Sequence, residues 1–122
     1  MIENGFMELN DTQRLEEHLD QAGEQPVILF KHSDTCGISA RAFREMAKLE
    51  KPVALVTVQK ARALSNEIES RFALPHETPQ VLVVRAGKLA WSASHFRITA
   101  DAVTQAFEKA AGRSKPDPDQ SG

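Results

Sequence analysis

The single cysteine of the chain, Cys36, stands between an apolar segment and an amphipathic one. Residues 27–30 precede it, and Ile38, Ala42 and Met46 follow it at the spacing of one helix face. A thiol at a helix start meets unpaired backbone N–H groups and a partial positive charge, which stabilise the thiolate that attacks disulfides. We therefore expect Cys36 to be the nucleophile of a thiol–disulfide exchange reaction.

Ser39 occupies the position that the second cysteine takes in a Cys-x-x-Cys motif. A serine hydroxyl cannot attack a disulfide, so a mixed disulfide on Cys36 has no resolving thiol within this chain. Ser39 could still donate a hydrogen bond to the Cys36 thiolate. The pattern therefore predicts monothiol chemistry that depends on an external thiol.

The residues next to Cys36 are expected to support its reactivity. Thr35 is the predicted cap of the following helix. Gly37 leaves its backbone N–H free to face the sulfur, which a proline at that position could not do. The charged neighbours are Lys31, His32 and Arg41, which could favour the thiolate, and Asp34, which could oppose it.

Other roles for Cys36 have weaker support in the sequence. A free cysteine is often a small buried hydrophobe, but the polar approach through residues 32–35 argues against that. A hydrolase would need a base, and no local motif ties His32, His76 or His95 to the cysteine. A phosphate-binding loop of the phosphatase type would need arginine where Ala42 stands, so that class is rejected.

Thr78 and Pro79 open a second apolar segment about forty residues after Cys36. Proline at the first position of a strand is ordinary, whereas a cis peptide bond before it is rare. We predict a cis Thr78–Pro79 bond, with the backbone of Thr78 beside Cys36. There it would pair with a substrate segment as a short added strand.

Hydrophobic periodicity and breakers predict alternating helices and strands. The expected helices lie within 10–23, 35–51, 61–75 and 99–112, the last one capped by Thr99, and the expected strands lie at 26–32, 53–58, 81–84 and 89–91. The resulting order is α-β-α-β-α-β-β-α. It predicts an α/β fold with a four-stranded mixed sheet and helices on both faces, which without its first helix is the minimal thioredoxin-like order. We expect one domain over residues 1–112 and a disordered tail over 113–122, which is poor in apolar residues.

Composition narrows the function classes. One cysteine in 122 residues excludes a disulfide framework and a multi-cysteine zinc site, and no metal site is expected. The net charge of −2 shows no excess of basic residues of the kind that nucleic-acid-binding proteins carry. No apolar run approaches the roughly 20 residues that a bilayer span needs. The expectation is a cytoplasmic monomer that associates with neither nucleic acid nor membrane.

Four segments together resemble the YtxJ family, the monothiol bacilliredoxins of the bacillithiol system. They are Phe30-Lys31-His32-Ser33, Thr35-Cys36-Gly37-Ile38-Ser39, His76-Glu77-Thr78-Pro79-Gln80, and Trp91 to His95 continuing through Ile98-Thr99. The resemblance implies a thioredoxin fold and removal of bacillithiol from protein mixed disulfides, with Cys36 as nucleophile. The chain departs from the family's Thr-Cys-Pro-Ile-Ser motif at Gly37.

The resemblance also suggests the other participants. No cofactor is expected to be bound, bacillithiol or a similar small thiol is the co-substrate, and S-thiolated proteins are the clients. Since bacillithiol carries carboxylates, its site should offer donors and positive charge. By analogy with glutaredoxins, one group of candidates follows the hairpin: Ser94, His95, Arg97 and the helix start at Thr99. A second group is expected to flank the sulfur: Lys31, His32 and Arg41.

Three alternatives stay open at this point. A glutathione-using monothiol glutaredoxin with an iron–sulfur cluster would carry Cys-Gly-Phe-Ser, and residues 36–39 match it except at Ile38. A peroxidase or redox sensor would form a sulfenic acid on Cys36. A non-catalytic binding module would use the Thr78–Pro79 face and leave Cys36 idle.

Overall fold

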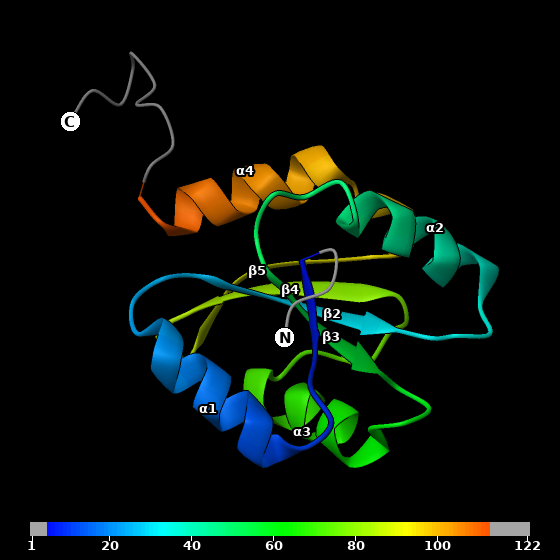
Figure 1. Cartoon of the computed structure of the whole chain (residues 1–122), viewed down its shortest axis with the longest axis horizontal. Helices are drawn as coiled ribbons and strands as arrows, with labels where there is room; N and C mark the ends of the chain where they lie inside the picture. The colour runs from blue at the N-terminus through cyan, green and yellow to red at the C-terminus, as the bar shows by residue number, and fades with distance from the viewer. Residues whose placement is uncertain (1–4, 113–122) are drawn as a thin grey trace.

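The computed structural model describes residues 5–112, in which helices and strands alternate along the chain. In order they are β1 (Phe6–Glu8), α1 (Thr12–Ala22), β2 (Val27–His32), α2 (Gly37–Met46), β3 (Val53–Thr57), α3 (Arg62–Phe72), β4 (Gln80–Arg85), β5 (Lys88–Ser94), the short 3-10 helix η1 (His95–Arg97) and α4 (Ala100–Ala110). The strands form one mixed sheet in the order β1-β3-β2-β4-β5 (Figure 1).

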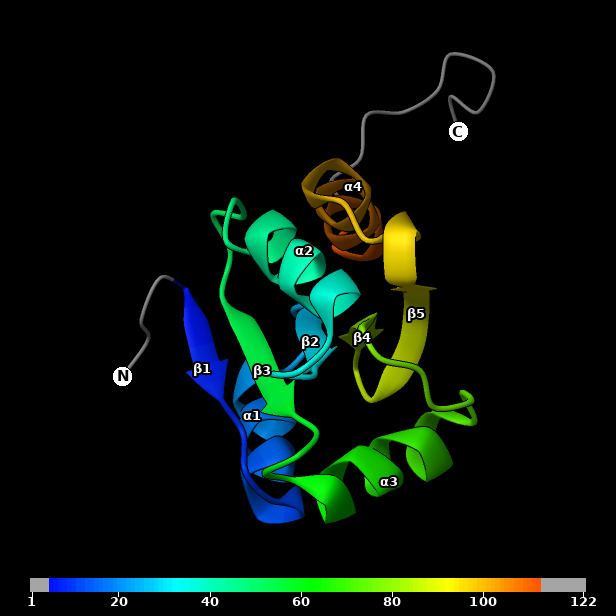
Figure 2. The same ribbon diagram turned by 90° about the vertical axis from the view of Figure 1, so that its right-hand side faces the viewer.

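The central strand β2 is buried at all six positions because it is paired on both sides and covered on both faces. It runs parallel to β3 and antiparallel to β4. Its residues Ile28 and Phe30 belong to the core under α2 and α4, whereas Val27 and Leu29 belong to the core over α1 and α3. Figure 2 shows the sheet between these two helix layers.

The expected α/β order is confirmed, but the strand count of four is wrong, because β1 adds a fifth strand. β1 pairs with β3 in parallel over three residues, and flanking backbone bonds join Val53 N–H to Gly5 O at 2.7 Å and Leu9 N–H to Leu55 O at 2.8 Å. A strand of three residues is too short to show a detectable alternation of apolar and polar side chains. β1 is a strand because it pairs with β3, which lies far along the chain.

The predicted cap of α2 is also corrected. The N-cap residue is Cys36, with extended backbone angles, and α2 begins at Gly37, one residue later than a Thr35 cap implies. The predicted Thr99 cap of α4 is confirmed, since its hydroxyl accepts the Ala102 N–H at 3.1 Å. The expected tail over 113–122 lies outside the described residues.

Register brings three connections to one edge of the sheet. Lys31, near the end of β2, pairs with Gln80 at the start of β4, and Gln80 pairs in turn with Ser94 at the end of β5. The segments after β2, before β4 and after β5 therefore meet at this edge. They are the segments that carry the residues singled out from the sequence.

Candidate active site around Cys36

Cys36 lies between β2 and α2 and is partly exposed. Its carbonyl accepts the Ala40 N–H at 3.0 Å, the first hydrogen bond of the helix. The Cys36 side chain itself makes no capping hydrogen bond to this helix start. The first-turn N–H groups of a helix have no partner within the helix, and Cys36 stands at that end of α2.

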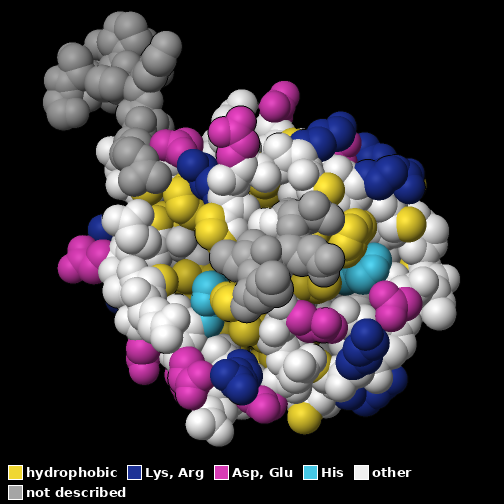
Figure 3. Space-filling view, in the orientation of Figure 1, with side chains coloured by type: hydrophobic (Ala, Val, Ile, Leu, Met, Phe, Trp, Pro, Cys, Tyr) yellow, Lys and Arg dark blue, Asp and Glu magenta, His cyan; other side chains and the backbone are white. Residues whose placement is uncertain are grey.

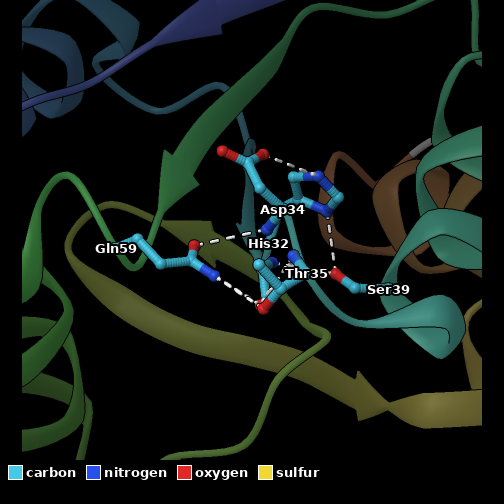
Figure 4. Close-up of polar contacts among 6 residues, drawn as sticks. His32, Asp34, Thr35, Ser39 and Gln59 are labelled. Carbon is cyan, nitrogen blue, oxygen red and sulfur yellow. Dashed lines mark hydrogen bonds and ion pairs between the residues drawn. The ribbon is translucent and has the colours of Figure 1, made fainter.

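Ser39 is fully buried and is bonded to the strand before the cysteine. Its Oγ accepts the Ser33 N–H at 3.0 Å and lies 2.8 Å from His32 Nδ1 (Figure 4). On its other side, His32 Nε2 lies 3.5 Å from Asp34 Oδ1. The position of a second cysteine is thus occupied by a hydroxyl engaged with β2 and the loop that follows it.

The direction of these bonds follows from their partners. Burial lowers the pKa of His32, and the Asp34 carboxylate and the bond to Ser39 partly offset this, so the imidazole is neutral near pH 7. A carboxylate only accepts, so the proton belongs on the Nε2 that faces Asp34. Nδ1 then accepts, and the Ser39 hydroxyl donates to it. The expected bond from Ser39 to Cys36 would need that same proton.

Gln59, in the connection between β3 and α3, is a contributor that the sequence analysis missed. Its Nε2 donates to Ser33 Oγ at 2.7 Å and to Thr35 Oγ1 at 3.2 Å, and its Oε1 accepts the Asp34 N–H at 3.2 Å (Figure 4). These bonds span 24 to 26 positions of sequence. The available signal is its place just after a strand that is parallel to β2, because such strand ends share a sheet edge.

The Thr78–Pro79 peptide bond is cis, as predicted. The Thr78 hydroxyl lies 3.1 Å from His76 Nε2, and the His76 N–H donates to Glu69 on α3 at 3.3 Å. Burial and the charge of Lys31 lower the pKa of His76. Within residues 5–112, the backbone N–H and C=O of Thr78 have no hydrogen-bond partner, so this short edge is open to an added strand.

Lys31 does not lie beside Cys36. It has the same strand parity as Leu29, so its fully buried side chain points into the layer of α3, away from α2. Burial lowers its pKa, and the charge of Glu69 on α3 partly offsets this. Its Nζ has no hydrogen-bond partner among the described residues.

The candidates that follow the hairpin surround η1. His95 has a left-handed φ of 55°, donates its N–H to Pro79 O at 3.1 Å and holds Nδ1 3.2 Å from Glu77. Ser94 ends β5 opposite Gln80, and Arg97 is exposed.

Arg41, on α2, reaches the same region. Its Nη1 donates to Ile98 O at 3.5 Å, and its guanidinium carbon lies 5.4 Å from the centre of the Phe96 ring. The sequence analysis did not single out Phe96. These contacts join α2 to η1 and the segment after it.

The start of α4 is already satisfied by the protein itself. Glu45 Oε1 accepts the Ala100 N–H at 2.9 Å, and Thr99 accepts the Ala102 N–H. The expected capture of a ligand carboxylate at this helix start would bring it against the Glu45 carboxylate. Ligand carboxylates are better matched by the free donors of nearby arginines.

A cavity of about 480 Å³ lies on the other side of α2, next to β1 and β3. His32 and Asp34 line it together with Glu8, Arg44 and Lys60. Within residues 5–112, no three His, Cys, Asp or Glu side chains are grouped as a metal site would require, and none of the helices has the length and hydropathy to cross a bilayer.

Comparison with known proteins agrees with this geometry. A solved protein with a thioredoxin fold is 28% identical, with a TM-score of 0.78 over 83% of this chain and 92% of that one. Thioredoxin f from spinach chloroplast, short form, is 18% identical, with a TM-score of 0.68 over 91% and 97% of the two chains. Fasciola hepatica thioredoxin is 13% identical, with a TM-score of 0.69 over 84% and 97%.

A thioredoxin fold with a cysteine at the start of α2 defines the class: the protein is a thiol–disulfide oxidoreductase. The family model of the monothiol bacilliredoxin BrxC matches residues 7–103. The chain therefore belongs to the monothiol bacilliredoxin family.

Proposed function

We propose that the protein removes bacillithiol, or a closely similar small thiol, from protein mixed disulfides. The Cys36 thiolate attacks the small-thiol sulfur of the disulfide, that S–S bond breaks, and the client leaves as a thiolate that takes a proton from water. A new S–S bond now joins Cys36 to the small thiol. The thiolate of a second small-thiol molecule attacks the sulfur of the small thiol in this bond, so the Cys36 thiolate leaves and a disulfide of two small thiols forms. Overall, the client thiol is regenerated and one free small thiol is oxidised, because the other half of the product disulfide was already oxidised on the client.

The observation that carries this proposal is the state of Ser39. It fills the resolving position, it is buried, and its hydroxyl is bonded to His32 and Ser33. With Cys36 as the only cysteine, the adduct can be released only from outside the chain. The open backbone of Thr78 supports the first step, because it offers a client segment a place to pair at the sheet edge that also carries the connection with Cys36.

The identity of the small thiol is proposed from the family, which is named for bacillithiol chemistry. The rest of the proposal follows from the same chemistry. The protein acts as a monomer in the cytoplasm, where thiols are kept reduced. It binds no cofactor of its own, and its clients are S-thiolated proteins.

Intact-mass measurement tests the function directly. The reduced protein is mixed separately with oxidised bacillithiol, oxidised glutathione and oxidised coenzyme A, with Cys36→Ser as the control. We expect a fast adduct with bacillithiol that is absent in the control and released by reduced bacillithiol. A preference for glutathione would assign the glutaredoxin-type reaction instead, and absence of every adduct would contradict an exchange function.

A further inference from the structure

Two large hydrophobic side chains are exposed within residues 5–112, and both lie beside the active site. Ile38, 36% exposed, is two positions after Cys36 on α2, and Phe96, 63% exposed, is in η1. η1 contacts α2, and its first residue is bonded to Pro79 O. We refer to Ile38, Arg41 and Phe96 together as the rim.

The backbone that presents Phe96 to solvent is unfavourable in itself. β5 ends at Ser94 and the chain turns through His95, whose φ of 55° is left-handed and costly for a residue with a side chain. The exposed phenyl ring that follows gains little from burial. Local strain and exposed aromatic surface both concentrate at binding sites. Their coincidence next to the Cys36 helix indicates a ligand-binding role for Phe96.

Arg41 is held in place and still has donors to offer. The Phe96 ring and the Ile98 carbonyl fix its guanidinium. Among the described residues, only that carbonyl accepts from it. A guanidinium carries five N–H groups, so a fork suited to a carboxylate remains unused.

Among the described residues, no carboxylate forms an ion pair with Arg41. Glu77 lies 3.2 Å from His95, and Glu45 is bonded to Lys48 and to the Ala100 N–H. The charge of Arg41 contributes to the lowered pKa of Glu45, but no hydrogen bond joins the two side chains, so the Arg41 donors stay available to a ligand. Figure 3 shows basic side chains gathered over α2. A carboxylate that reaches the rim therefore meets positive charge beside an apolar ring.

We propose that the rim binds the part of the small thiol that does not react. Its carboxylate pairs with Arg41 and its compact body lies on Phe96, while its sulfur reaches Cys36. This inference rests on the proposed function, because it requires a small-thiol disulfide at Cys36, and it adds the residues that hold the carboxylate-bearing end: Arg41, with Phe96 beside it. Three side chains match a small molecule in size, since a protein partner typically buries about 800 Å² on each side.

Matched disulfide probes test the role of Arg41. Adduct formation on Cys36 is timed by quenched-flow mass spectrometry with dithiodipropionate, which carries carboxylates, and with hydroxyethyl disulfide, which is neutral. We expect Arg41→Gln to slow adduct formation with dithiodipropionate about tenfold, because a charge-assisted pair is lost. Adduct formation with hydroxyethyl disulfide should slow less than about twofold. Arg44→Gln, one turn further along α2, is the control and should change neither rate.

The role of Phe96 is tested with oxidised bacillithiol. Phe96→Ala should slow this reaction several-fold and leave hydroxyethyl disulfide unchanged, and the Arg41→Gln/Phe96→Ala double variant should lose less than the product of the two effects. The inference is overturned if each variant slows all probes equally, if neither slows any, or if only a thiolated protein reacts more slowly. In each of these cases wild-type Cys36 still reacts, whereas a wild-type cysteine inert to every disulfide would remove the proposed function itself.

Discussion

The two sides of Cys36 differ in how far their hydrogen bonds are used. On one side lies a network of polar side chains, each of which contacts at least one other member. We refer to this network as the clamp; its members are His32, Ser33, Asp34, Thr35, Ser39 and Gln59. On the other side the rim leaves most Arg41 donors unused and exposes an aromatic ring. A satisfied network fixes geometry, and an open one can bind a ligand. The clamp thus positions the loop that carries Cys36, and the rim on the other side is the proposed binding site for the small thiol.

The largest expected effect is on the clamp. Ser39→Ala leaves the Ser33 N–H and His32 Nδ1 buried without a partner, and each lost partner costs about 1–3 kcal/mol. We expect the free energy of unfolding to fall by about 2–3 kcal/mol, measured by urea denaturation. Ser70→Ala, on the exposed face of α3, is the matched control and should change little. A Ser39→Ala protein as stable as wild type would show that the clamp is not a structural unit.

The second effect is a pH dependence within the clamp. Because burial lowers the pKa of His32 below its usual 6.5, the unfolded chain binds the proton more readily between the two values. Stability therefore falls as pH falls from 6.5 through the folded pKa, and is constant below it.

His32→Asn tests this dependence, since its side-chain oxygen can still accept from Ser39 without titrating. The pKa values of His18 and His76 are also lowered, so the quantity to measure is the difference between the urea-unfolding pH profiles of variant and wild type. The variant should lose less stability on acidification. Parallel profiles would mean that His32 is not held neutral by its surroundings.

A smaller effect is expected at Gln59, whose side chain is exposed. Gln59→Ala removes three hydrogen bonds to the loop before Cys36, yet water can replace them at the surface. We expect a loss of about 1 kcal/mol in unfolding free energy and a several-fold change in the Cys36 alkylation rate. Gln13→Ala, which removes one exposed bond on α1, should alter neither. An unchanged alkylation rate would show that the hydrogen bonds of Gln59 do not influence the reactivity of Cys36.

The sequence could predict most of the fold and half of the site, for identifiable reasons. Periodicity predicted the helices and the longer strands, and Cys36, Ser39, Thr78 and Pro79 stand in local patterns. Gln59 and β1 depend on partners distant in the sequence.

Other features needed the three-dimensional structure. From the sequence, an aromatic residue such as Phe96 is usually expected to lie in the hydrophobic core. Because β2 is buried at every position, its sequence does not show which residues face which layer, and the prediction that Lys31 flanks the sulfur is wrong.

The smallest effect on exchange is expected at Lys31, and it tests whether the two sides of Cys36 are sufficient. Its buried ammonium faces α3 and has no hydrogen-bond partner among the described residues, which is unfavourable for a charge. Lys31→Met keeps the length of the side chain and removes that penalty. We expect a stability equal to or above wild type in urea, and adduct rates with both disulfide probes within about twofold of wild type, because Lys31 belongs to neither clamp nor rim. A selective loss of rate with dithiodipropionate would mean that Lys31 acts on the ligand through the sheet, and the division between clamp and rim would have to include the α3 layer.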